Sequence, residues 1–114
     1  MSATSTDSGG GDHFRIRRRI LEILYDLFRE IPYGWIELSQ LEEGCQADTA
    51  ALNWNVVYLE KSGLLDLNRS TECYPYIAFS AAITASGIDL VENEAAFESR
   101  FPVCRGATSI SRFE

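Results

Sequence analysis

The sequence predicts an α+β, mainly helical domain with a three-helix core, a β-hairpin and a further C-terminal helix. Three patterns support this prediction. Apolar residues recur at helical spacing over residues 14–31, two shorter helical patterns follow with a brief interruption between them, and two strand-like segments then flank a polar turn. The chain has 114 residues, of which 46% are hydrophobic, so its length and composition suit one folded domain.

The first helix follows a polar N-terminal segment. Residues 1–12 are small and polar and have little area to bury, so we expect a disordered tail there. Beyond it, apolar residues repeat with the helical period; they are Ile16, Ile20, Ile23, Leu24, Leu27 and Ile31. Pro32 ends this helix, because proline lacks the backbone donor and its ring clashes with the preceding turn.

Two shorter helices are predicted in the middle of the chain. The first covers residues 37–43, and Gly44 is expected as its C-cap. Asp48 is expected to cap the second helix, because its carboxylate can accept a hydrogen bond from a free amide of the first turn. This helix runs to about residue 62 and is ended by Gly63; its inward-facing residues are Leu52, Val56 and Leu59.

The period of the pattern then changes to that of strands. Residues 64–68 predict one strand and residues 74–83 a second strand antiparallel to it, with the polar residues 69–73 as the turn. Thr84 is expected to cap a helix over residues 85–92.

The predicted domain therefore covers residues 13–93. Residues 94–114 form a C-terminal helical extension and a flexible tail. Within it, residues 94–101 continue the preceding helix or form a short fifth one, and residues 102–114 are expected to be partly ordered at most.

Two helices joined by a turn of three to four residues fit a helix-turn-helix, and a hairpin after them fits a wing. The segment VVYLEKSGLL (residues 56–65) is similar to a recognition-helix ending, and ITASGID (residues 83–89) to a wing-to-helix exit. Gly44 and Asp48 match the turn and the cap between the two motif helices. Residues 14–92 thus resemble the winged helix-turn-helix family of small prokaryotic and archaeal regulators.

The resemblance implies a DNA-binding transcriptional regulator with residues 48–62 in the major groove and residues 64–83 as the wing. It also implies double-stranded DNA as the partner and a homodimer, since such regulators bind as two-fold dimers. The residues expected to recognise bases are Thr49, Asn53 and Trp54. Those expected to contact phosphates are Arg15, Arg18, Arg19, Lys61 and Arg69. The expected dimer surface contains Phe97, Phe101 and Val103.

Several of these residues also have a plainer interpretation. Asn53 and Asn55 are equally compatible with solvated positions, and Trp54 with packing against the hairpin or against Trp35. Gly87 lies inside a predicted helix, where glycine costs about 1 kcal/mol relative to alanine. Its presence suggests the close approach of a neighbouring backbone, with ordinary helix packing as the alternative.

The charge balance argues against nucleic acid. Ten basic and 17 acidic side chains give a net charge of −7, whereas phosphate contacts supply most of the nonspecific affinity for DNA. The basic cluster lies apart, at residues 15–19. The alternative function is therefore a protein–protein interaction module on the same scaffold, with an acidic recognition helix and Trp54 as the anchor. The side of the molecule on which the arginines lie relative to Asn53 distinguishes the two functions.

The composition also bears on the habitat. One lysine among ten basic residues, together with the acidic excess, is similar to the composition of proteins from extreme halophiles. An acidic protein from an ordinary habitat is an equally good interpretation.

Other classes of function lack support in the sequence. We expect no enzyme, because no glycine-rich phosphate loop is present and His13 lies at the edge of the tail. We expect no metal, no cofactor and no membrane-spanning segment. Residues 1–12 do not form a secretory signal, so we expect a cytoplasmic protein. Its three cysteines are then reduced, and Cys45 suits a packed position better than a redox sensor.

Overall fold

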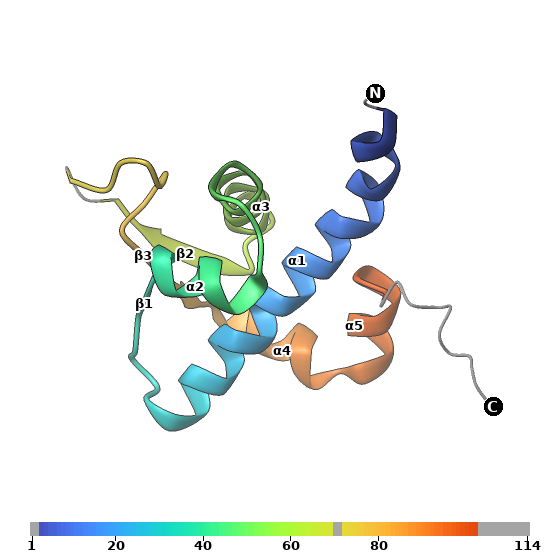
Figure 1. Ribbon diagram of the computed structural model, residues 1–114. Helices are drawn as coiled ribbons and strands as arrows, with labels where there is room; N and C mark the ends of the chain where they lie inside the picture. The colour runs from blue at the N-terminus through green and yellow to red at the C-terminus, as the bar shows by residue number, and fades with distance from the viewer. Residues whose placement is uncertain (1–2, 70–71, 103–114) are drawn as a thin grey trace.

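The computed structural model describes residues 3–69 and 72–102 and has an α+β, mainly helical fold (Figure 1). Within these residues, five helices pack around a small three-stranded antiparallel sheet. The elements are α1 (Ala3–Glu30), β1 (Ile36–Glu37), α2 (Leu38–Cys45), α3 (Thr49–Lys61), β2 (Leu65–Asn68), β3 (Ser80–Ile83), α4 (Ala85–Glu92) and α5 (Glu94–Arg100). Helix α1 is central, because α2, α3, β3 and α4 all pack against it.

Helix α1 is longer than the sequence predicts. It begins at Ala3 instead of near His13, so the segment expected as a disordered tail is helical from its third residue. Extending a helix that has already formed avoids the cost of nucleation, although the glycines at residues 9–11 oppose the extension through their low helix propensity. The buried face contains Ile16, Ile20 and Leu24 as predicted.

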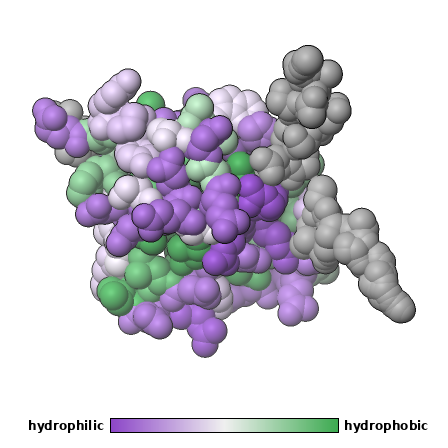
Figure 2. Space-filling model, in the orientation of Figure 1, coloured by the Kyte–Doolittle hydropathy of each residue, from purple (hydrophilic) through white to green (hydrophobic). Residues whose placement is uncertain are grey.

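Apolar side chains are exposed at the C-terminal end of α1. Ile31, predicted to face inward, is 54% exposed there. Figure 2 shows hydrophobic side chains gathered between α2 and the C-terminal half of α1, whereas hydrophilic ones cover most of the centre of this face. The last turn of α1 therefore extends past the core.

The turn between α2 and α3 uses different residues from those predicted. Helix α2 continues through Gly44 to Cys45, and Gln46 takes the left-handed conformation at its C-cap, with φ 53°. Gly44 instead packs close to α1, since a Cβ there would lie 2.7 Å from Cδ1 at the end of the Ile23 side chain, which would have to shift. The N-cap prediction for α3 is confirmed, because Oδ1 of Asp48 accepts a hydrogen bond from the amide of Ala51 at 2.8 Å.

The sheet has the strand order β1-β3-β2, and both pairs are antiparallel. Gly63 has φ 79° and ends the α3 segment in the left-handed conformation, as predicted. The strand expected over residues 74–83 is wrong in length, because only Ser80–Ile83 pairs in the sheet. Residues 74–79 belong to the loop that joins β2 to β3, and Asn53 of α3 is hydrogen-bonded to this loop.

Helices α4 and α5 close the other side of α1. Thr84 caps the start of α4 by accepting a hydrogen bond from the amide of Gly87 at 3.1 Å. Asn93 lies between α4 and α5 and caps the start of α5. Phe97 and Phe101 are only 5% and 1% exposed, so they pack in the core of their own chain. The predicted dimer surface is therefore wrong for these two residues; Val103 lies outside the described residues.

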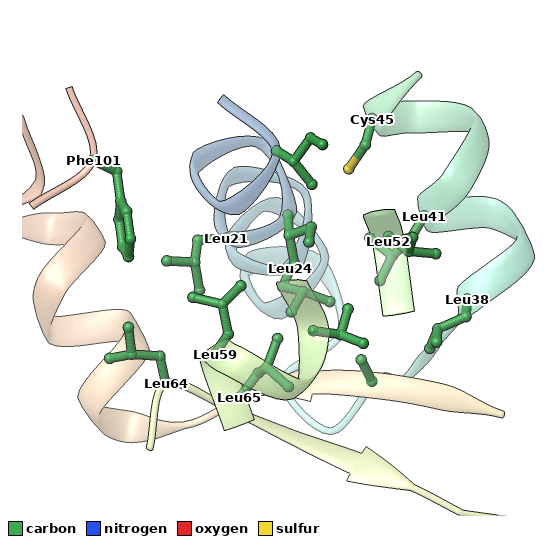
Figure 3. Packing of buried hydrophobic residues seen from close by; sticks show 14 of the residues in the cluster. Leu21, Leu24, Leu38, Leu41, Cys45, Leu52, Leu59, Leu64, Leu65 and Phe101 are labelled. Carbon is green, nitrogen blue, oxygen red and sulfur yellow. The ribbon is translucent and has the colours of Figure 1, made fainter. Parts of the chain in front are cut away.

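The hydrophobic core lies where α1, α2 and α3 meet. Figure 3 shows Leu24 of α1, Leu41 of α2 and Leu52 of α3 directed toward one another. Leu59 of α3 and Leu65 of β2 extend this core toward the sheet. The predicted inward face of α3 is confirmed, because its three predicted residues have no exposed area. This packing fixes which face of α3 is left to solvent.

Candidate functional site

The outward face of α3 forms one wall of a shallow groove. The groove has a volume of about 580 Å³ and is lined by Ala50, Asn53, Trp54, Val57, Tyr58 and Lys61 of α3, with Ile77 of the loop between β2 and β3. We call it the α3 groove. Trp54 is 58% exposed and Ile77 is 44% exposed. Apolar side chains thus dominate a surface that the resemblance predicts to contact DNA.

Asn53 is occupied by its own chain. Its Nδ2 donates a hydrogen bond to the carbonyl of Pro75 at 2.9 Å, and its Oδ1 accepts one from the amide of Ile77 at 2.8 Å. Both ends of the amide therefore hold the loop between β2 and β3 against α3. Asn53 is therefore not merely solvated, and a bidentate contact with adenine would compete with its two hydrogen bonds to the loop.

The hydroxyl of Thr49 is also engaged. It donates to Oε2 of Glu42 at 2.6 Å, and the hydroxyl of Tyr76 donates to Oε1 of the same carboxylate at 2.5 Å. These hydrogen bonds, that of Thr49 first, lower the pKa of Glu42 below its ordinary value of 4.5. Together with Asp48, Glu42 places negative charge at the N-terminal end of α3, where the helix dipole favours it.

Arg69 forms an ion pair within the molecule. Its Nη1 and Nη2 donate to the two carboxylate oxygens of Glu60 at 2.9 and 2.6 Å. The hydrogen bonds to Arg69 lower the pKa of Glu60. The charge of Arg69 is thus matched by a carboxylate of α3 itself. Lys61 is exposed and lines the α3 groove, as the sequence predicts for a residue on this face.

The three predicted arginines of α1 lie elsewhere. Arg15, Arg18 and Arg19 line a second hollow of about 530 Å³, which shares no residue with the α3 groove. Arg15 donates to the carbonyl of Cys45 at 2.9 Å and Arg19 to that of Gly44 at 3.4 Å, which satisfies free carbonyls at the end of α2. The structure therefore does not bring these three arginines together with Asn53 and Trp54.

Arg18 joins α1 to α5. It donates to Glu22 at 3.2 Å, to Glu98 at 2.9 Å and to the carbonyl of Phe101 at 3.0 Å. The ring of Phe97 lies below its guanidinium group, with 4.6 Å from Cζ to the ring centroid. Only 18% of the Arg18 side chain is exposed. These contacts show that Arg18 holds α5 and Phe101 against α1.

Three residues beside Trp54 were not predicted as site residues from the sequence. His13 and Arg17 of α1 meet Asn55, Trp54 and Tyr58 where residues 13–17 of α1 pack against α3, and we call these five residues the Arg17 cluster. The guanidinium carbon of Arg17 lies 3.8 Å from the ring centroid of Tyr58 and 5.5 Å from that of Trp54. Burial is the main cause that lowers the pKa of Arg17. Trp54 therefore packs on His13 and Arg17, and neither predicted alternative, the hairpin or Trp35, describes it fully.

The burial of Asn55 could have been predicted from the sequence. This residue is fully buried, so the interpretation as a solvated residue is wrong. Its position three residues after Leu52 and four before Leu59 places it on the inward face of α3. A polar residue on a buried helical face requires hydrogen-bond partners, and Arg17 supplies one at 2.8 Å.

Comparisons with protein-family models, with curated proteins and with solved structures give no match. Among the residues that the structure describes, no three His, Cys, Asp or Glu side chains converge to hold a metal ion. In the same residues, no helix combines the length and the hydrophobicity needed to cross a bilayer.

Cys45 lies in the core at the end of α2 and is 1% exposed. Burial raises the pKa of its thiol to about 11, so the reactive thiolate is scarce at neutral pH. This agrees with a packed cysteine. Cys73 is half-buried in the loop between β2 and β3, and Cys104 lies outside the described residues.

Proposed function

We propose that the chain is a winged-helix domain whose α3 groove binds a protein partner. The element order supports the winged-helix assignment, because two helices joined by a short turn precede a hairpin. The apolar outward face of α3 supports a protein partner, because aromatic residues surrounded by apolar side chains are typical of interface centres. The 58% exposure of Trp54 on this face carries the proposal.

The polar groups around α3 favour a protein over DNA. Thr49, Asn53 and Arg69 all have partners inside the molecule, so DNA recognition through these side chains would compete with those contacts. Strongly salt-dependent DNA binders make about 6–10 phosphate contacts. Lys61 is the one basic residue among those that line the α3 groove.

Photo-crosslinking tests the proposal directly. A benzophenone side chain in place of Val57, which lines the groove, is irradiated in an extract of the source cells. We expect a protein adduct, and Trp54→Ala should weaken the identified complex by about 30-fold, the effect of truncating an interface hot spot. Trp35→Ala is the matched control, because Trp35 is 48% exposed on another surface. An adduct that nuclease removes, or one unaffected by Trp54→Ala, contradicts the proposal.

DNA binding is the second candidate. The helix-turn-helix order and the position of Lys61 on the outward face of α3 favour it. Amide chemical shifts recorded with random-sequence duplex at about 0.1 M and about 1 M salt test it, since phosphate contacts weaken with salt. Shifts in α3 that Lys61→Ala reduces would favour DNA, whereas unchanged spectra leave the protein partner. A homodimer also stays a prediction, now without Phe97 and Phe101 at its interface.

A further inference from the structure

The outward face of α3 carries a row of residues whose spacing is the same in both directions. Four residues that line the α3 groove, Ala50, Trp54, Val57 and Lys61, follow one another at intervals of four, three and four. These intervals follow one face of an α-helix, as in the seam by which two helices pack together. Because the order is unchanged on reversal, a second α3 that runs antiparallel presents the same four residues at matching positions.

Antiparallel packing brings unlike residues of this row together. Trp54 of one copy lies opposite Val57 of the other, which gives the exposed indole an apolar neighbour. Lys61 of one copy lies opposite Ala50 of the other, whose small side chain leaves room for the apolar stem of the lysine. Each of these contacts occurs twice, because the two surfaces of a two-fold interface are identical.

The charges at the two ends of α3 are complementary in the same direction. The N-terminal end carries the exposed Asp48 and, bound to the hydroxyl of Thr49, the carboxylate of Glu42. The C-terminal end carries the exposed Lys61. Within residues 3–69 and 72–102, neither Asp48 nor Lys61 forms an ion pair. Antiparallel packing places each Lys61 beside the acidic end of the other α3, whereas parallel packing would place like charges together.

We propose that the partner in the α3 groove is a second copy of this chain, bound with the two α3 helices antiparallel about a two-fold axis. The assignment of this partner rests on the proposed function, because the surface is the same. Trp54 lies near the centre of the interface, where tryptophan contributes most to binding. Lys61 lies at the rim and sets the direction of packing.

Sedimentation of the purified full chain over a range of concentrations tests the dimer. We expect a reversible dimer, and Trp54→Ala should raise its dissociation constant about 30-fold, the effect of truncating an interface hot spot. A benzophenone side chain in place of Val57 should give a cross-linked species with twice the mass of the chain. Trp35→Ala should leave the dimer intact, because Trp35 is exposed and lines a different hollow. A chain that sediments as a monomer at every concentration overturns the proposal.

Charge changes at the rim test the direction of packing. Ala50→Lys should raise the dissociation constant about tenfold, because it places a second cation beside Lys61 of the other copy, twice in each dimer. Adding Lys61→Glu to this variant should restore the dimer, since the reversed pair attracts again. Ala50→Glu, which keeps a good helix former at the same position, should instead lower the dissociation constant. Failure of the double variant to recover shows that the helices do not pack antiparallel and refutes the proposal.

Asp66→Asn is the control for net charge. It changes the charge by the same one unit as Ala50→Lys, at an exposed position of β2 outside the α3 groove, so it should leave the dissociation constant unchanged. A dimer that responds to neither Trp54→Ala nor Ala50→Lys uses another surface, which also overturns the proposal. If the purified chain is monomeric but an extract yields an adduct with a different protein that Trp54→Ala weakens, only this assignment of the partner fails. If neither a dimer nor an adduct forms, the proposed function fails as well.

Discussion

Gly63 and Gly87 are required for different physical reasons. Gly63 has φ 79°, and a Cβ there would meet nothing within 4 Å, so it is needed for its backbone conformation. Gly87 is needed for space, because a Cβ there would lie 2.3 Å from the carbonyl oxygen of Leu64. The close backbone approach predicted for Gly87 is therefore confirmed.

Gly87→Ala should lower the free energy of unfolding by about 1–3 kcal/mol, because the Leu64 carbonyl belongs to the backbone and cannot turn aside. Urea titration measures this change. At the other glycine, Gly63→Asn should cost less than Gly63→Ala, since asparagine tolerates the left-handed conformation. A Gly87→Ala variant as stable as the parent would refute the close approach.

At the scale of elements, one carboxylate joins α2, α3 and the loop between β2 and β3. Glu42 of α2 accepts from Thr49 of α3 and from Tyr76 of the loop. Because these hydrogen bonds lower the pKa of Glu42, its ionised form stabilises the fold. This contribution is present above the ordinary pKa of 4.5 and is lost as the pH falls through the lower value of the folded state.

Glu42→Gln should therefore destabilise the protein at pH 7, and the difference from the parent should shrink as the pH falls below about 4.5. Thermal unfolding from neutral to acidic pH measures it. Glu43→Gln is the control, because the neighbouring Glu43 is exposed. A constant difference between Glu42→Gln and the parent at every pH would show that charge is not involved.

Arg18 connects α5 to the rest of the molecule. Arg18→Ala should lower the free energy of unfolding by about 1.5–3 kcal/mol, the usual effect of hydrogen bonds to charged groups, and should speed amide exchange in α5. Arg19→Ala should have little effect, because Arg19 is 47% exposed and its contacts are 3.4 Å long. If Arg18→Ala instead kept full stability and weakened binding to DNA, its predicted role as a phosphate contact would be restored.

At the scale of the whole molecule, the net charge of −7 opposes the compact state through self-repulsion. Raising salt from about 0.1 to 1 M shortens the Debye length from about 10 to 3 Å, so the unfolding midpoint should rise. Thermal unfolding at several NaCl concentrations measures this. Asp66→Asn, at an exposed position of β2, should reduce the dependence, and a midpoint that falls with salt would show that ion pairs outweigh the repulsion.

Much of the fold could be predicted from local patterns. The spacing of Leu52, Val56 and Leu59 fixed the inward face of α3, and Asp48 and Gly63 marked where its segment begins and ends. These signals are local, because side-chain period, capping and backbone conformation depend on residues that are near in sequence. The same local rules could not limit β3 to Ser80–Ile83, since pairing depends on where the loop docks.

The chemistry of the α3 groove required the tertiary structure. The sequence showed that Asn53, Trp54 and Lys61 share the outward side of α3, but not that Asn53 is bonded to the loop. It placed the arginines of α1 on one helix, but not at the carbonyl end of α2. Hydrogen-bond partners far apart in sequence are selected by packing, which no local pattern encodes.

By itself, then, the sequence determined the order of α1 to α4 with the two hairpin strands, the inward positions of Leu52, Val56 and Leu59 in α3, and the acidic character of the chain. Only the tertiary structure shows that His13 and Arg17 of α1 contact Asn55 and Trp54 of α3. The physical reason is that burial and periodicity act along one helix, whereas the crossing of α1 over α3 depends on how their side chains interlock.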